Sequence, residues 1–293
     1  MRNSPPKLSV QALANAGEKA VLARRERAAI KKSLAEGEIS IFDVINDGRD
    51  SIQRMRIREL LDAAPGVGER RAFTIMEKAS ISKSRRIAGL GIHQLRKLRE
   101  EMILNKVPVN EGTLIVMSGP GGVGKSTITA HLRSHPAIVI SVSATTREPR
   151  DNEIDGRDYH FLTDEKFDKL ISDNEFLEWA EFAGARYGTL RKSVDEARSL
   201  GKHVLLEIEI AGARQIRKAE PDALLIFISP PSWEELVERL TSRGTDSPER
   251  RAARLALAQE EMACAAEFDE ILVNHQVEDV AETLLSLLSS RLK

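Results

Sequence analysis

The chain has 293 residues, of which 41% are hydrophobic and 30% charged, so it can form two domains with cores of their own. Its one cysteine, Cys264, excludes an intramolecular disulfide, and no apolar run approaches the roughly 18 residues of a membrane span. No apolar leader follows Met1, and together these features predict a cytoplasmic protein with no membrane partner.

The net charge of −1 hides an uneven distribution of charge. Residues 1–108 contain 22 Lys and Arg against 13 Asp and Glu, whereas the remainder contains 22 against 32. A basic block of about +9 joined to an acidic block of about −10 indicates two modules, and the basic one favours a polyanionic partner. A solvated charged surface is the alternative explanation.

Residues 10–102 show a helical pattern, because apolar residues recur at spacings of three and four. The pattern is interrupted at residues 37–40, 47–48, 65–68 and 88–91, each a place where one helix can end and the next begin. This predicts a small all-α domain over residues 1–104. The polar stretch 105–112, which contains Pro108 and Gly112, is the predicted linker.

Residues 113–293 show a different pattern, in which short apolar β-branched runs alternate with amphipathic helical segments. Continuous apolar strands between helices are typical of a parallel sheet covered on both faces. The sequence therefore predicts an α/β domain with a five-stranded parallel sheet core. The expected strands are residues 113–118, 138–142, 204–210, 224–229 and 271–274.

A phosphate-binding loop follows the first expected strand and precedes a helix. Its glycines allow successive N–H groups to point at a phosphate, and the helix N-terminus adds positive potential. Lys125 is expected to reach the β- and γ-phosphates of a nucleoside triphosphate, and the Ser126 hydroxyl to hold Mg²⁺. A GTPase, an ATPase motor and a kinase all fit this loop. Its residues are Gly119, Pro120, Gly121, Gly122, Val123, Gly124, Lys125, Ser126 and Thr127.

Two arginines after the second expected strand suggest a site for a second phosphate. Arg147 and Arg150 are three residues apart on a polar loop. A guanidinium group binds a phosphate in bidentate fashion, so the pair is suited to a phosphate beyond the one in the loop. Solvated loop arginines are an equally common outcome.

From residue 113 to about 288 the sequence resembles guanylate kinase, a P-loop nucleoside-monophosphate kinase. The resemblance lies in the phosphate-binding loop and in residues 143–150, 158–159, 176–180, 187–189, 205–209 and 239–245, which follow in order and at the spacing of that family. This many motifs in sequence is specific to the family rather than to P-loop proteins in general.

The resemblance implies a GMP site beside the ATP site. Glu178 and Thr189 are expected to read guanine, since a carboxylate can accept from N1–H and N2–H₂ and a hydroxyl can donate to O6, whereas adenine would leave these groups mispaired. The residues implied for GMP are Ser143, Arg147, Arg150, Tyr159, Glu178, Tyr187, Thr189 and Glu209.

The resemblance also implies direct in-line transfer of the γ-phosphoryl group, with no covalent enzyme intermediate. Ser126 would ligate Mg²⁺ directly and Glu207 through water. Two residues depart from the family pattern: Glu209 stands where aspartate is usual, and Ala211 where glutamine is usual. Altered affinity is expected rather than lost activity. The catalytic residues implied are Lys125, Arg147, Arg150, Arg239, Arg243 and Arg254.

The basic helical part resembles the actinobacterial integration host factor, a small helical DNA-binding protein. The resemblance lies in residues 23–28, 60–68, 72–77 and 84–91. It implies a duplex DNA partner bound through the phosphate backbone, because glycine turns expose N–H groups and nearby cations neutralise phosphates. Ala88 stands where these proteins tend to carry an arginine. The residues implied are Gly66, Gly68, Arg70, Arg71, Lys83, Arg85 and Arg86.

Two functional hypotheses follow from the sequence. The first is a guanylate kinase acting on GMP or dGMP, with a nucleic-acid-binding arm. The alternative is a DNA-binding or scaffold protein whose kinase-like domain senses nucleotide with weak activity. The arm is also compatible with an RNA, ribosome or protein partner.

Overall fold

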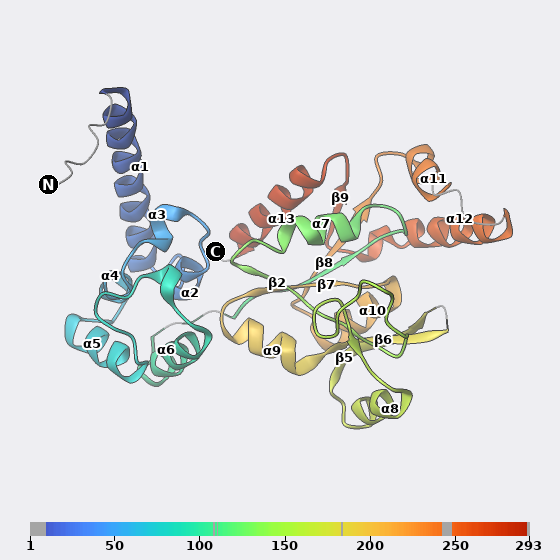
Figure 1. Cartoon of the computed structure of the whole chain (residues 1–293), viewed down its shortest axis with the longest axis horizontal. Coiled ribbons are helices and arrows are strands. Elements are labelled where there is room, and N and C mark those ends of the chain that lie inside the picture. Colours follow the sequence, from blue (N-terminus) through green and yellow to red (C-terminus); the bar gives the residue numbers. More distant parts are fainter. Residues whose placement is uncertain (1–9, 108, 110, 183, 242–247, 292–293) are drawn as a thin grey trace, which may run out of the picture. The chain divides into compact units, whose positions relative to one another are not determined.

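The computed structural model describes residues 10–107, 109, 111–182, 184–241 and 248–291. Contacts divide the chain into two compact units, one within residues 1–110 and one of Glu111–Arg291 (Figure 1). The division falls inside the stretch expected to be a linker, and the domain bounds themselves stay a prediction.

The N-terminal unit is helical throughout its described residues. Its long first helix, α1, is followed by short helices joined by tight turns, and Ser40 caps α2 by accepting from Asp43 N at 3.2 Å. Phe42, Ile52 and Leu60 lie at the centre of its core and are fully buried. The helices are α1 Val10–Ala35, α2 Ile41–Ile45, α3 Asp50–Gln53, α4 Ile57–Ala63, α5 Glu69–Lys78, η1 Ile87–Gly89 and α6 Ile92–Leu104.

The second unit is built on a five-stranded parallel sheet in the order β2-β7-β1-β8-β9. This confirms the fold class expected from the alternating pattern. Continuous apolar runs form these strands, since both faces of the sheet are covered. The strands are β1 Leu114–Ser118, β2 Ile138–Ile140, β7 His203–Glu207, β8 Leu224–Ser229 and β9 Glu270–Val273.

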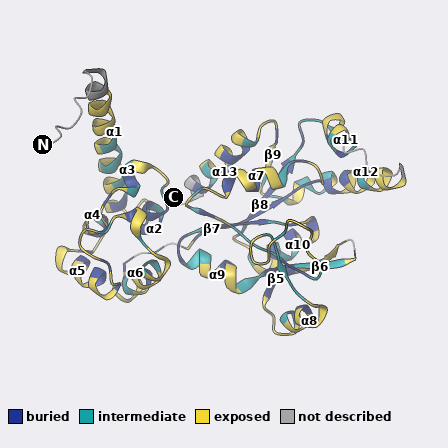
Figure 2. Cartoon of the chain, in the orientation of Figure 1, coloured by how far each residue is buried: buried dark blue, intermediate teal, exposed yellow. Residues whose placement is uncertain are grey.

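Alternate residues of β1 supply the two cores on either face of this sheet. Figure 2 colours the ribbon by burial, and the central strands are largely dark blue, as buried residues are. Ile115 and Met117 pack with the helices α7, α11, α12 and α13, whereas Leu114 and Val116 pack with α9 and α10. The helices are α7 Lys125–Leu132, α9 Arg191–Ser199, α10 Ile210–Ala219, α11 Trp233–Thr241, α12 Pro248–Ala263 and α13 Val277–Arg291.

A second sheet was not expected from the sequence. It has four strands in the order β4-β3-β6-β5 and is flanked by α8 Asp164–Ser172. Two of its strands have only two residues, and the other two contain polar residues among the apolar ones, so they lack the continuous apolar runs that reveal the first sheet. They are β3 Ala144–Thr145, β4 His160–Phe161, β5 Phe176–Phe182 and β6 Ala185–Leu190.

The topology brings the expected site segments to one edge. β1 and β7 are parallel neighbours, so the loop after β1 and the residues after β7 leave the sheet at the same edge. The antiparallel pair of β5 and β6 presents Glu178 opposite Thr189. Across the described ranges, no helix combines the length and apolar character that a membrane span requires.

Candidate active site

The phosphate-binding loop has a backbone that requires glycine where it leaves β1. Gly119 has φ of +144°, and a Cβ atom there would lie 2.3 Å from the carbonyl oxygen of Ile228 on the adjacent strand β8. A side chain at this position would therefore displace the loop from the sheet. The helix α7 begins at Lys125, so its first N–H groups face the inside of the loop.

Lys125 lies across the loop rather than out in solvent. Its ammonium group donates to Gly119 O at 2.5 Å and to Pro120 O at 3.3 Å. These contacts hold the charge at the mouth of the loop, where a bound phosphate would meet it.

Ser126 and Glu207 meet at the edge of the sheet. The Ser126 hydroxyl donates to Glu207 Oε1 at 2.7 Å, and Thr129 Oγ1 donates to Glu207 Oε2 at 3.0 Å. Hydroxyl and carboxylate oxygens are the hard ligands that Mg²⁺ prefers, and it is usually held by few protein groups together with phosphates and waters. The two residues therefore fit the magnesium site that the sequence suggests. No cluster of three or more Asp, Glu, His or Cys side chains suited to a metal occurs among the residues described.

A cavity of about 690 Å³ opens over the phosphate-binding loop. Arg239 of α11 and Arg254 of α12 line it together with Lys125, and Arg239 also pairs with Glu235 at 3.2 Å. His275, which follows β9, lines it as well and was not expected. Arg243, which the sequence suggests as a third arginine here, lies outside the described residues.

A second cavity, of about 280 Å³, lies beside the first. It is lined by seven of the eight residues expected for GMP, and these come from β5, β6, the end of β7 and the loops around β3. Its charged and hydroxyl groups are Ser143, Arg147, Arg150, Tyr159, Glu178, Tyr187, Glu207 and Glu209.

Thr189 is the expected GMP residue that does not line this cavity. It is fully buried behind Glu178, and its hydroxyl donates to Glu178 Oε1 at 2.6 Å. Glu178 is itself 5% exposed, and Gly212 of α10 lies so close that a Cβ atom there would be 2.6 Å from Glu178 Oε2. Burial raises the pKa of Glu178, while the hydrogen bonds from Thr189 oppose the rise.

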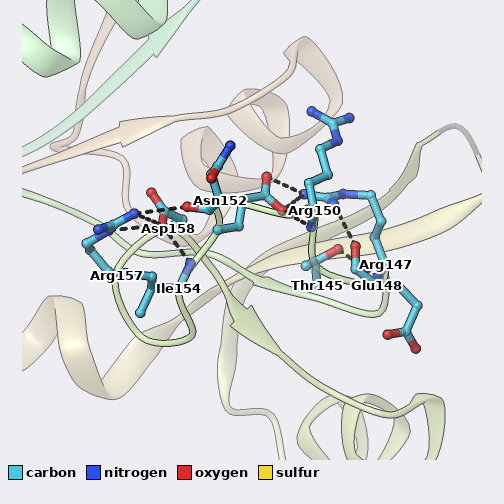
Figure 3. Close-up of polar contacts among 9 residues, drawn as sticks. Thr145, Arg147, Glu148, Arg150, Asn152, Ile154, Arg157 and Asp158 are labelled. Atoms are coloured by element: carbon cyan, nitrogen blue, oxygen red, sulfur yellow. Dashed lines mark hydrogen bonds and ion pairs between the residues drawn. The ribbon is translucent and has the colours of Figure 1, made fainter.

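Arg147 is held by a carboxylate that the sequence interpretation missed. Its Nη2 donates to both oxygens of Glu153 at 2.9 Å, and Glu153 Oε2 also accepts from Arg150 N at 2.8 Å. The guanidinium group lies 5.4 Å from the centre of the Tyr159 ring. Figure 3 shows this loop, in which Arg147 and Arg150 project from one turn of chain. The signal that the sequence offered for this partner is an acidic residue, Glu153, three positions after Arg150.

Hydrogen bonding lowers the pKa of Glu153, first from the Arg150 N–H and then from Arg147. The carboxylate is therefore ionised at neutral pH, and it fixes the direction of the Arg147 guanidinium group.

Gln215 is a second residue that sequence reasoning missed. Its side-chain oxygen accepts a hydrogen bond from Trp179 N at 3.2 Å, and its side-chain nitrogen donates one to Trp179 O at 2.8 Å. These two bonds connect α10 to β5 next to Glu178.

The residues expected to bind nucleic acid lie around two turns of the N-terminal unit. Arg71 donates to Gly66 O at 2.6 Å, and Arg85 donates to Gly89 O at 3.0 Å. These contacts orient the two guanidinium groups against the glycine turns. The other three cations have different surroundings. Arg86 donates to Arg54 O at 2.6 Å, and Lys83 lies 4.6 Å from the centre of the Phe73 ring. Arg70 is exposed in the first turn of α5, two residues after Gly68.

The phosphate-binding loop adjoins a cavity lined by arginines at the edge of a parallel sheet. This arrangement defines the class of P-loop nucleoside-monophosphate kinases. Comparison with known proteins narrows this class. The family model described as guanylate kinase matches residues 111–291, and the chain belongs to the guanylate kinase family.

Relatives and solved structures agree with this assignment. The guanylate kinase of Streptomyces kasugaensis is 58% identical over 60% of this chain and 86% of its own length. That of Leifsonia xyli subsp. xyli is 43% identical over 81% of this chain and 95% of its own length, so the similarity extends into the N-terminal unit. The crystal structure of guanylate kinase from Anaplasma phagocytophilum covers 62% of this chain and 87% of its own, with 33% identity and a TM-score of 0.50.

The N-terminal unit has its own match. The family model described as S13-like H2TH domain matches residues 34–102. A structure described as sIHF bound to an 8bp palindromic DNA is 45% identical over 29% of this chain and 97% of its own, with a TM-score of 0.28.

Removing the carboxylate of Glu153 should weaken GMP binding. In Glu153→Ala, Arg147 loses its bidentate partner and the loop loses the bond to Arg150 N, so we expect the KM for GMP to rise about 10- to 100-fold, as misplacement of a binding group does. The KM for ATP should change little. Steady-state kinetics with each substrate varied in turn measures both. Asp151→Ala, which removes an exposed carboxylate from the same loop, is the control, and an equal effect there would assign the loss to charge alone.

The raised pKa of Glu178 predicts a pH-dependent affinity for GMP. Guanine needs the ionised carboxylate, so the KM for GMP should increase as pH falls through this pKa, starting above the usual glutamate value of about 4.3. Glu178→Gln should lose this pH dependence and raise the KM for GMP about 100-fold, because an amide mispairs with guanine. Glu181→Gln, at an exposed position of the same strand, should behave like the unmodified chain.

Proposed function

We propose that the chain transfers the γ-phosphoryl group of ATP to GMP or dGMP, giving ADP and GDP or dGDP. One observation carries this proposal: Glu207 and Glu209 line both cavities, so the two sites adjoin at the end of β7. Two nucleotides bound there would bring their phosphates to a shared boundary. A GTPase or an ATPase motor would have no use for the second cavity.

The second cavity suits a nucleoside monophosphate. Arg147 and Arg150 supply two guanidinium groups, and Tyr159 and Tyr187 add hydroxyls from neighbouring strands and loops. The rings of the two tyrosines meet edge to face with centres 6.0 Å apart, which fixes their orientation. We infer that these groups, with Ser143, bind the acceptor phosphate through charge-assisted hydrogen bonds.

Glu178 is placed to select the base. It is buried at the wall of the cavity and is held by Thr189, so its carboxylate has a fixed direction. A fixed acceptor matches the N1–H and N2–H₂ donors of guanine and would face the N1 acceptor of adenine. In this arrangement Thr189 acts on guanine through Glu178, and its direct contact with O6 stays a prediction. Glu209, at the start of α10, completes the wall.

Positioning and electrostatics would carry the transfer. Lys125 approaches from the loop, and Arg239 and Arg254 approach from the other side of the donor cavity. Cations that converge on the transferring group stabilise the charge on its equatorial oxygens, and a protein wall around it excludes water that would otherwise hydrolyse ATP. Arg243 stays a prediction of the sequence for the same role.

A Mg²⁺ ion held here would supply positive charge that neutralises the ATP phosphates. We infer that Ser126 would ligate it directly and Glu207 through water, because both oxygens lie at the mouth of the loop. In this structure Glu207 accepts from Ser126 and Thr129 together, and it thereby fixes the direction of the Ser126 hydroxyl.

We further propose that the N-terminal unit binds duplex DNA. Its two glycine turns each carry an arginine bonded to the turn itself, and further cations surround them. Such groups contact phosphates without reading bases, so affinity rather than sequence preference is expected. RNA, a ribosome or a protein remains an alternative partner, and a cytoplasmic location stays a prediction of the sequence.

Loss of Lys125 should abolish the kinase reaction without unfolding the protein. In Lys125→Ala we expect GMP-dependent formation of ADP to fall by at least about 100-fold, the usual cost of losing a group that stabilises transition-state charge. A coupled assay measures the rate, and circular dichroism checks the fold. Lys166→Ala, at an exposed position of α8, serves as the control.

The same assay with GMP, dGMP, AMP and UMP tests the acceptor. GMP and dGMP should be phosphorylated far faster than the others. A better rate with AMP or UMP would contradict the role given to Glu178. Turnover near background with every acceptor would favour the alternative of a nucleotide-sensing scaffold.

DNA binding by the full chain should weaken steeply with salt. Each phosphate neutralised contributes about 0.9 to the slope of log K against log salt concentration, so Arg70→Ala or Lys83→Ala should each lower the slope by about one. Gel-shift titrations at several salt concentrations measure it. Lys19→Ala, at an exposed position of α1, should leave the slope unchanged. Binding of RNA but not of duplex DNA would overturn the proposed partner.

A further inference from the structure

Glu261 is a buried carboxylate on α12 that the proposed mechanism does not use. The residue is 8% exposed, and its Oε2 accepts a hydrogen bond from the backbone N–H of Gly121 at 3.2 Å. The two residues are 140 positions apart in the sequence. Burying a carboxylate costs free energy unless it is hydrogen-bonded, and the bond from the phosphate-binding loop offsets part of this cost.

The surroundings of Glu261 connect it to both halves of the site. Burial and the nearby Glu209 raise the pKa of Glu261 to about 7, whereas the Gly121 N–H and Lys125 oppose the rise. At neutral pH both protonation states are therefore populated. Either state retains an oxygen that can accept from Gly121, so the contact does not require a full negative charge.

Gly121 lies at a part of the loop that side-chain packing does not hold. It is exposed at the wall of the donor cavity, and a Cβ atom built there would meet no atom within 4 Å. Its position thus depends on backbone contacts. The bond to Glu261 is one, and the bonds of Lys125 to Gly119 and Pro120 and of Val123 N to Pro120 O at 3.3 Å also hold this turn.

Glu261 also lies on the face of α12 that carries Arg254. Residues 254, 258 and 261 are spaced by four and three, so they form one stripe along the helix. Ala258, in the middle, is 1% exposed and packs in the core beneath the sheet, and Arg254 lines the donor cavity. A bond at Glu261 therefore fixes the rotation of α12 about 10 Å from Arg254.

We propose that Glu261 is a positioning residue for ATP, which holds Gly121 and the Arg254 face of α12 in one arrangement around the donor phosphates. The proposal rests on the proposed function and adds to it a residue outside the phosphate-binding loop. Glu261 bonds the donor loop directly and reaches the acceptor cavity only through Glu209, so the effect should fall more on ATP and on the rate than on GMP.

The test compares Glu261→Ala with Glu261→Gln in the full chain. In the alanine variant we expect the KM for ATP to rise and kcat to fall, each about tenfold, as for the loss of a buried hydrogen bond, with the KM for GMP within about twofold. The glutamine variant keeps an accepting oxygen and should stay within about threefold of the unmodified chain. Glu260→Ala, the exposed neighbour on the same helix, should be unchanged.

A double-mutant cycle with Arg254→Ala tests how Glu261 acts. If Glu261 positions Arg254, the second substitution should cost clearly less in the Glu261→Ala background than alone. Full additivity, a glutamine variant as impaired as the alanine variant, or equal rises in both KM values would each overturn the proposal. Calorimetric titration of ATP without GMP provides a separate measure of the donor site. Failure of the unmodified chain to phosphorylate GMP would instead overturn the proposed function.

Discussion

The hydrogen bonds from Ser126 and Thr129 to Glu207 connect the start of α7, after the phosphate-binding loop, with the end of β7, and the rest of the site depends on them. They arise because β1 and β7 are parallel neighbours whose carboxyl ends meet at one edge. The phosphate-binding loop leaves from one strand and the acidic segment from the other. Any change that shifted this pairing by one residue would invert the side chains of β7 and turn Glu207 away.

At three places in the site, a carboxylate accepts a hydrogen bond from a group that is expected to contact phosphate or lies in the phosphate-binding loop. Glu207 holds Ser126, Glu153 holds Arg147, and Glu261 holds the loop at Gly121. Each places a donor in a fixed direction before a substrate enters, which reduces the ordering cost of binding. The cost is competition, because an incoming phosphate must share or replace these partners. Such a site favours a ligand of high charge and matching shape over a weaker anion.

The sequence predicted one part of this arrangement well. The five-stranded parallel sheet and its phosphate-binding loop follow from short, continuous apolar runs and a glycine pattern, which are local signals. The four-stranded sheet was missed, because strands such as β3, with two residues, and β5, whose apolar residues are interrupted by Glu178 and Glu181, owe their structure to their pairing partners. The GMP residues could still be named, since a family resemblance supplied what periodicity did not.

The residues that escaped prediction share a physical cause. Glu153 and Glu261 are ordinary acids in the sequence, and only the fold brings them to Arg147 and Gly121. Thr189, which is expected at guanine, donates its hydroxyl to Glu178 because β5 pairs with β6 at these two residues, and its contact with guanine stays a prediction. A motif therefore identifies which side chains gather at a site, whereas the role of each side chain depends on the contacts that the fold gives it. The guanine selection that we propose would accordingly rest on how rigidly Thr189 and the close approach of Gly212 hold one buried carboxylate.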